Sequence, residues 1–197
     1  MIFLLYRILW WILLPIIIPL RFYKDWRSPL GVQQFSHRFG LHRVPQADYI
    51  VHAVSLGEVR AVTPLIYKML HQFPHAKILF TATTLTGSEQ IQKTFKTELE
   101  SGAITHTYLP LDNGWMVAHF LDQVAPKAIL IMETEIWPNL IAAAQKRGIP
   151  FFIISACLSD RSFLRYQKLG KTMTELLKEV TVFAQTEEDL QRFKALG

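Results

Sequence analysis

The fold class of this chain can be inferred from residues 128–139, Ala128-Ile-Leu-Ile-Met-Glu-Thr-Glu-Ile-Trp-Pro-Asn139. Its first five residues are a continuous apolar run, which predicts a strand buried on both faces, and Pro138 is typical of the first turn of a helix. A buried strand followed by a helix is the repeating unit of parallel α/β sheets. The same unit occurs upstream, where 49–55 predicts a strand and 58–73 predicts a helix.

The alternation of strand and helix continues to the end of the chain. Further strands are predicted at 77–81, 103–108, 151–154 and 180–184, and further helices at 87–95, 113–121, 138–147, 160–179 and from 187 onward. Apolar strands that alternate with helices predict a Rossmann-like, doubly wound parallel sheet of about six strands, covered on both faces. We therefore expect residues 48–197 to form one α/β domain.

The first 20 residues are an apolar segment with a single charge, Arg7. As a helix, residues 2–20 would extend roughly 28 Å, close to the hydrocarbon thickness of a bilayer. A cleaved signal peptide is disfavoured because no basic stretch precedes the run and no small-x-small cleavage site follows it. A buried core helix is disfavoured because the apolar residues lie on every face. We predict a membrane-anchor helix at 1–20, with a bent or half-embedded helix as the alternative because of Pro15 and Pro19.

The charge distribution predicts how this anchor is oriented. Residues 1–47, which include a predicted basic connector at 21–47, carry six Lys and Arg against one acidic residue, a net charge of +5. From Asp48 onward, fifteen basic and fifteen acidic residues cancel. The positive excess predicts an inner-membrane protein whose body lies on the cytoplasmic side, next to anionic lipids. Nucleic-acid binding is disfavoured because the basic residues flank the membrane-like segment. The single cysteine, Cys157, excludes an internal disulfide and fits a reducing compartment.

Carboxylates follow two of the predicted strands. Glu58 closes the segment His52-Ala-Val-Ser-Leu-Gly-Glu58, and Glu133 and Glu135 follow the strand at 128–132. Ligands bind at the carboxyl edge of such sheets, so carboxylates gathered there suggest acid–base chemistry on a hydroxyl or a sugar. If strand geometry continues past Met132, alternation would turn Glu133 and Glu135 to the same side. Glu58 has an equally simple structural explanation, because Glu is favoured in the first turn of a helix. No metal is expected, since no His accompanies these residues at ligand spacing.

Two further segments are candidates for substrate binding. Gly57 would let a substrate approach the backbone. The hydroxyl-rich loop at 81–88 could bind phosphate or sugar hydroxyls, or simply cap a helix, but it lacks the pattern of a P-loop or a dinucleotide site. A basic helical face between 160 and 179 is either solvated or binds an anion. The candidates from these two segments are Thr83, Thr84, Thr86 and Gly87 in the loop, and Arg161, Arg165 and Lys168, followed by Lys171, in the helix.

Together these motifs resemble the bacterial Kdo transferases, which add 3-deoxy-D-manno-octulosonic acid (Kdo) to the lipid A precursor. The resemblance extends over the whole chain and rests on ordered motifs at 52–58 (with the core S-x-G-E), 83–87, 109–112, 133–139, 168–170 and 185–189. It implies a two-domain GT-B glycosyltransferase, of which this chain would be the acceptor-side N-terminal half.

The resemblance also implies a reaction and roles for individual residues. Kdo would pass with inversion from CMP-Kdo to the 6′-hydroxyl of the lipid A precursor, in lipopolysaccharide core biosynthesis, without a cofactor or metal. Glu58 would be the general base and Glu133 would help to stabilise the transition state, while Ser55, Gly57, Glu135 and the candidates above would bind substrate.

Two departures from the family pattern bear on activity. The family commonly reads Asn-Ala-Arg-Leu-Ser where this chain has Ser155-Ala-Cys-Leu-Ser159, so that Cys157 replaces a cation. The domain that binds CMP, with its transition-state lysine, has no counterpart in this sequence. The alternatives to an active transferase are a catalytically incompetent, membrane-tethered module that binds the acceptor, and a nonfunctional gene remnant.

Overall fold

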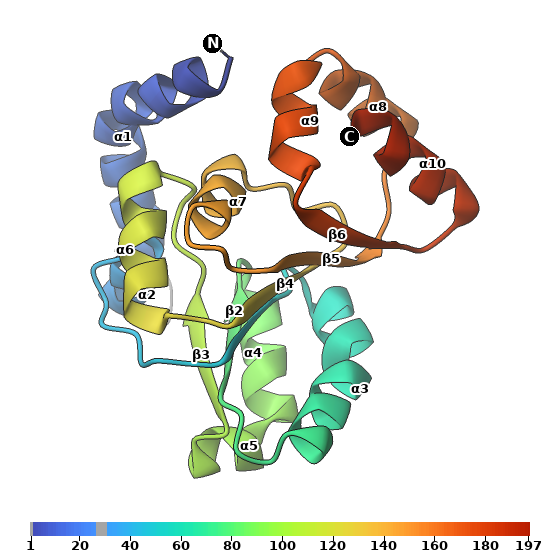
Figure 1. The fold of residues 1–197 in the computed structure, drawn as a ribbon. Helices are drawn as coiled ribbons and strands as arrows, with labels where there is room; N and C mark the ends of the chain where they lie inside the picture. Colours follow the sequence, from blue (N-terminus) through green and yellow to red (C-terminus); the bar gives the residue numbers. More distant parts are fainter. Residues whose placement is uncertain (1, 27–30) are drawn as a thin grey trace.

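The computed structural model, which describes residues 2–26 and 31–197, contains one sheet of six strands in the order β3-β2-β1-β4-β5-β6 (Figure 1). All neighbouring strands in this sheet are parallel. The strands are β1 (Tyr49–His52), β2 (Ile78–Ala82), β3 (Ile104–Tyr108), β4 (Ala128–Met132), β5 (Phe151–Ala156) and β6 (Val180–Ala184). The predicted Rossmann-like parallel sheet is therefore confirmed.

Helices cover both faces of the sheet because its central strands are apolar on both sides. Ile50 and Val51 are neighbours in β1, yet each is fully buried in a different apolar layer. The layer around Val51 lies under α3 (Leu56–Gln72), α4 (Leu85–Thr94) and α5 (Lys96–Ser101). The layer around Ile50 lies under α6 (Gly114–Val124), α7 (Pro138–Gln145), α9 (Lys171–Leu177) and α10 (Glu187–Leu196).

The prediction of one continuous helix at 160–179 is wrong, because the structure has two helices there. They are α8 (Asp160–Gln167) and α9, and Gly170 between them has a φ of +48°. This backbone conformation lies outside the helical region and is open to glycine, so the chain turns instead of continuing. Consequently Lys171 does not share one helical face with Arg161, Arg165 and Lys168.

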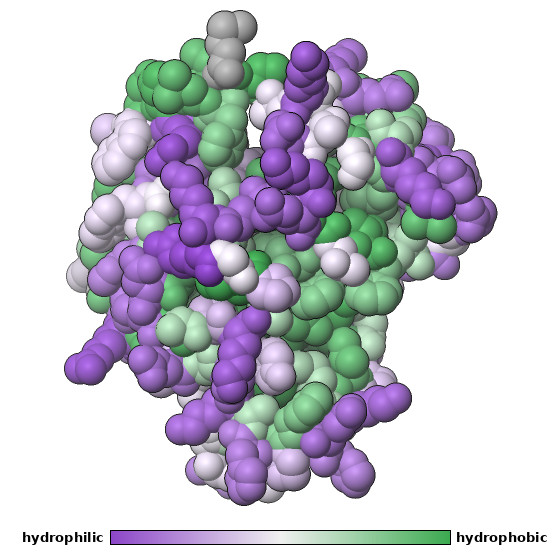
Figure 2. All heavy atoms as spheres, viewed as in Figure 1, coloured by the Kyte–Doolittle hydropathy of each residue, from purple (hydrophilic) through white to green (hydrophobic). Residues whose placement is uncertain are grey.

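The N-terminal segment forms a helix longer than the predicted anchor. Helix α1 (Ile2–Trp26) continues through Pro15 and Pro19, and α2 (Gly31–Arg38) follows. Residues 27–30 of the predicted connector lie outside the described part of the chain. The segment Ile2–Tyr23 of α1 is long and apolar enough to cross a membrane. Apolar side chains gather on the surface where α1 begins (Figure 2). An N-terminal helix that could serve as an anchor is therefore present.

Candidate functional site

Three carboxylates meet at the carboxyl edge of the sheet, and we call Glu58, Glu133 and Glu135 the carboxylate cluster. Strands β1 and β4 are hydrogen-bonded neighbours, so the segments that follow them lie side by side. The negative charge of Glu58 helps to raise the pKa values of both Glu133 and Glu135. Residues 75 positions apart in the sequence are thus brought within electrostatic reach of one another by the pairing of two strands.

Glu58 is held in place by the turn that precedes α3. Its Oε2 accepts a hydrogen bond from the backbone N–H of Val54 (2.8 Å), and its Oε1 accepts one from the Ser55 hydroxyl (2.9 Å). Ser55 caps the helix in return, since its Oγ accepts from the Glu58 N–H (3.3 Å). This reciprocal arrangement is a variant of the capping box in which the glutamate accepts from the N–H of the residue before the N-cap, and Glu58 is 8% exposed. Glu58 therefore has a structural role, and the same bonds fix the orientation of its carboxylate.

Glu133 has an unusual backbone conformation. Its φ is +57°, which is uncommon for a residue with a side chain, and its N–H donates to the Ile154 carbonyl oxygen (3.0 Å). Burial, followed by the charge of Glu58, raises the pKa of its carboxyl group. The expectation that Glu133 and Glu135 point to the same side required strand geometry to continue past Met132. The strand ends at Met132, so this condition is not met and alternation does not determine where the two side chains point. Such backbone strain is typical of functional sites.

Glu135 is positioned by an aromatic residue of its own motif. The indole Nε1 of Trp137 donates to Glu135 Oε2 (2.7 Å), and the Trp137 ring meets the His52 ring edge to face at 5.8 Å between centroids. Burial raises the pKa of Glu135, the indole bond lowers it, and the charges of Glu58 and Glu133 raise it further. Burial also lowers the pKa of His52 to about 3, so its ring is neutral at pH 7. Trp137 and His52 thus form an uncharged wall beside the cluster.

The hydroxyl-rich loop is largely occupied by internal hydrogen bonds. Thr84 caps α4, accepting from the Gly87 N–H (3.1 Å) and donating to the Val54 carbonyl oxygen (2.7 Å). Thr83 Oγ1 lies 3.4 Å from His52 Nε2, and Thr86 donates to Thr84 Oγ1 (3.4 Å). The loop therefore caps α4 and links the ends of β1 and β2. Helix capping was one of the two alternatives that the sequence left open for this loop.

The two glycines among the candidates differ in the space around them. A Cβ on Gly87 would lie 3.0 Å from the Val54 carbonyl oxygen and 3.0 Å from Thr84 Oγ1, so this position is closed to a side chain. A Cβ on Gly57 would meet only Ser55 Oγ, at 3.8 Å, and Gly57 is exposed. Gly87 is required for packing, whereas Gly57 leaves an open surface at the start of α3.

Helix α8 lies near the carboxylate cluster through Tyr166. Burial and the charge of Glu135 raise the pKa of the Tyr166 hydroxyl, and the charge of Arg165 lowers it. Arg161, Arg165 and Lys168 are exposed. These basic residues are therefore accessible to solvent, and the helix that carries them comes close to the carboxylate cluster.

Sequence reasoning missed Trp137, His52 and Tyr166 as parts of the site, and it also missed Arg38. The buried Arg38 donates from Nη2 to the Thr83 carbonyl oxygen (2.6 Å) and lies 4.6 Å from the centre of the Tyr108 ring. Trp137 and His52 stand inside the quoted motifs, so their position was a usable signal. Arg38 and Tyr166 come from distant elements and gave none.

Other parts of the motifs hold the site together. The Asp112 carboxylate accepts from the backbone N–H groups of Asn139 and Leu140 (2.9 Å each), which ties the segment at 109–112 to the start of α7. The carbonyl oxygen of Cys157 accepts a hydrogen bond from the Thr134 hydroxyl. Both contacts fix the loop that carries Glu133 and Glu135. Within residues 2–26 and 31–197 no cluster of His, Cys, Asp and Glu has the arrangement of a metal site.

The fold and the site define a class: a Rossmann-like α/β protein with a carboxylate site at the carboxyl edge of its sheet. Residues 33–197 match the sequence profile of the family described as 3-deoxy-D-manno-octulosonic-acid transferase (kdotransferase). The chain therefore belongs to the Kdo transferase family.

Several relatives carry the same name, 3-deoxy-D-manno-octulosonic acid transferase. The protein from Haemophilus influenzae is 37% identical over 176 residues, which is 87% of this chain and 40% of the relative. The protein from Bordetella pertussis is 38% identical over 148 residues, 75% of this chain and 34% of the relative. The protein from Rickettsia bellii is 31% identical over 197 residues, 98% of this chain and 46% of the relative. The chain thus spans less than half the length of these relatives.

Proposed function

We propose that this chain is the acceptor-binding part of a GT-B enzyme that transfers Kdo from CMP-Kdo to the 6′-hydroxyl of the lipid A precursor. Family membership supports a glycosyltransferase role in lipopolysaccharide core biosynthesis. The observation that carries the proposal is the carboxylate cluster, because a hydroxyl acceptor needs a base beside it. The CMP moiety would bind to the part of the relatives that this chain does not span.

In the proposed reaction, Glu58 removes the proton from the acceptor hydroxyl as its oxygen attacks the anomeric carbon of Kdo. The bond from that carbon to the CMP phosphate breaks with inversion, and CMP leaves with the electron pair. The bonds from Val54 and Ser55 orient the Glu58 carboxylate for this step. Glu133 stabilises positive charge that develops on the sugar. Glu135 binds a substrate hydroxyl.

The remaining candidates would recognise the acceptor. Arg161, Arg165 and Lys168 bind its phosphates by charge, and Gly57 gives it access to the backbone at the start of α3. The threonines of the loop act mainly by holding this edge in place. The N-terminal helix keeps the body at the cytoplasmic face of the inner membrane, where a lipid acceptor is found, and the basic residues of 1–47 favour anionic lipids.

The test joins this chain to the remaining part of a full-length relative and measures Kdo transfer to the tetraacyl lipid A precursor. Glu58→Gln should abolish transfer, whereas Glu89→Gln, the same substitution at an exposed position of α4, should not change it. Transfer by the Glu58→Gln protein at the rate of the unsubstituted protein would exclude Glu58 as the base.

A second candidate function is acceptor binding without catalysis. The residues of this chain would then hold the acceptor, and transfer would need the part of the relatives that this chain does not span. Adding CMP-Kdo and lipid A precursor to the purified chain distinguishes the two candidate functions. Product formation supports a complete enzyme, and lipid binding without product supports a binding module.

A further inference from the structure

Helix α1 has two different faces: one lies against the body of the protein, and the other is exposed. The residues with reduced exposure recur every three or four positions, which places them on one side of the helix. This body-facing row consists of Phe3, Tyr6, Trp10, Leu14, Ile17 and Arg21. The row spans about 27 Å at 1.5 Å per residue. Leu14 is its buried member and the other five residues are half-buried, so the helix lies along the body with one side turned toward it.

Specific contacts fasten this row to the body. Leu14 is 6% exposed and packs with Phe39 and Met116, in a small apolar cluster formed by α1, the end of α2 and α6. Nearer the N-terminus, the Tyr6 hydroxyl donates to Asp112 Oδ2 (2.8 Å). A polar bond to a buried carboxylate fixes the rotation of α1 about its axis as well as its position.

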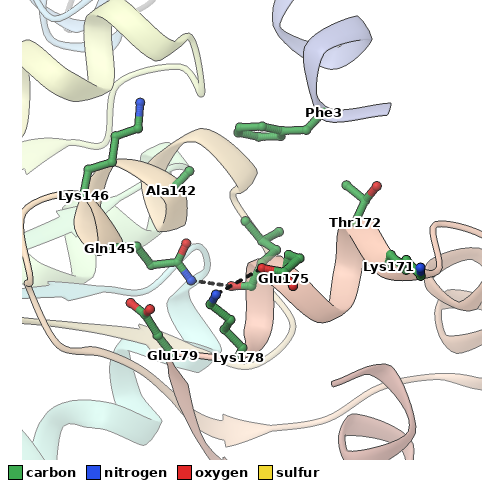
Figure 3. A pocket seen from close by; sticks show the side chains of 10 residues that line it. Phe3, Ala142, Gln145, Lys146, Lys171, Thr172, Glu175, Lys178 and Glu179 are labelled. Atoms are coloured by element: carbon green, nitrogen blue, oxygen red, sulfur yellow. Dashed lines mark hydrogen bonds and ion pairs between the residues drawn. The ribbon is translucent and has the colours of Figure 1, made fainter. Parts of the chain in front are cut away.

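The N-terminal end of α1 also lies against the body. Phe3 extends toward α7 and α9 and lines a cavity of about 600 Å³ between them (Figure 3). The other walls of this cavity carry charged side chains, among them Lys146 on one side and Lys171 on the other. Both lysines are exposed, so this end of the helix faces water and not hydrocarbon.

These contacts cannot coexist with a helix that crosses the bilayer. The hydrocarbon core is about 30 Å thick, so a crossing helix would put Phe3 on the side opposite to the body. Lys146 and Lys171 would then have to lie in or beyond the hydrocarbon, at a cost of several kcal/mol for each charge. The docked row therefore requires both ends of α1 to be on the same side of the membrane.

The rest of α1 is suited to lipid. Its exposed face is formed by large apolar side chains, among them Leu4 (61% exposed), Trp11 (62%), Ile12 (63%) and Leu20 (66%). We infer that α1 is a monotopic anchor: it lies along the membrane surface with this face inserted into one leaflet and its opposite face docked on α2 and α6. The net charge of +5 in residues 1–47 favours an anionic leaflet. This inference is independent of the proposed reaction.

Cross-linking in the membrane tests the arrangement directly. In a Cys157→Ser background, Phe3→Cys and Thr172→Cys place two thiols in the lining of one cavity, one on α1 and one on α9. After expression in bacteria, membranes washed with high salt are treated with a flexible bismaleimide, and linked peptides are identified by mass spectrometry. We expect the cross-link in the membrane-bound protein. The control pair, Phe3→Cys with Lys96→Cys on the distant α5, should give none.

Labelling from each side of the membrane gives an independent readout. An impermeant maleimide should label Ile2→Cys and Lys96→Cys from the same side in sealed vesicles, because a monotopic helix keeps both on one side. Three results would overturn the inference: labelling of Ile2→Cys from the opposite side, absence of the Phe3–Thr172 cross-link in protein that remains in the membrane, or recovery of the protein outside the membrane fraction.

Discussion

Replacing Glu58 separates its structural role from its proposed chemical role. Glu58→Ala removes the acceptor of the half-buried Val54 N–H and of the Ser55 hydroxyl. Leaving a fully buried donor without a partner costs about 1–3 kcal/mol, so a half-buried donor costs an amount in the lower part of this range, and losing the cap costs about 1 kcal/mol more. We therefore expect Glu58→Ala to lower the free energy of unfolding by about 2–3 kcal/mol. Glu58→Gln keeps an amide oxygen for the Val54 N–H and should cost less than about 1 kcal/mol.

Urea unfolding of the purified chain measures these two values, and transfer is measured in the joined full-length protein. Both variants should lack transfer, although only Glu58→Ala should be clearly destabilised. Equal unfolding midpoints for the two variants would show that the carboxylate does not hold the turn as the geometry requires. Normal transfer by the stable Gln variant would refute the assignment of the base.

Three further outcomes are expected. Gly57→Ala should leave the urea midpoint of unfolding unchanged or slightly raised, whereas Gly87→Ala should lower stability by about 1–3 kcal/mol because its Cβ has no room; equal midpoints would contradict the packing. Trp137→Phe removes the indole bond that lowers the pKa of Glu135, so this pKa should rise in a carbon-13 NMR titration, and a fall would refute the contact. Burial raises the pKa of Asp112 from 3.8 to about 6, so the folded state binds its proton more tightly than the unfolded state does. The free energy of unfolding should therefore fall as the pH rises from 3.8 to about 6. Asp112→Ala should flatten this part of the pH profile of the urea midpoint.

Much of the architecture was accessible from the sequence because it depends on local patterns. The apolar runs at β4 and β6 gave both strands with the bounds that the structure has, and a parallel sheet with helices on both faces followed. Local patterns were insufficient where one residue changes the backbone. The φ of +48° at Gly170 divides a helix that was predicted to be continuous. The φ of +57° at Glu133 lies just past the end of β4, so the strand geometry that alternation required does not continue there.

The sheet, the family motifs and the presence of carboxylates after β1 and β4 could be inferred from the amino-acid sequence alone, because strand periodicity and residue type are local properties. The interactions between these parts are visible only in the folded protein. The pairing of β1 with β4 brings Glu58 close enough to Glu133 and Glu135 to raise their pKa values. Likewise, hydropathy shows that α1 could enter a membrane, but only the packing of residues such as Leu14 shows that one face of α1 contacts the body of the protein. Contacts between distant elements carry no periodic signal in the sequence, and it is the free energy of packing that selects them.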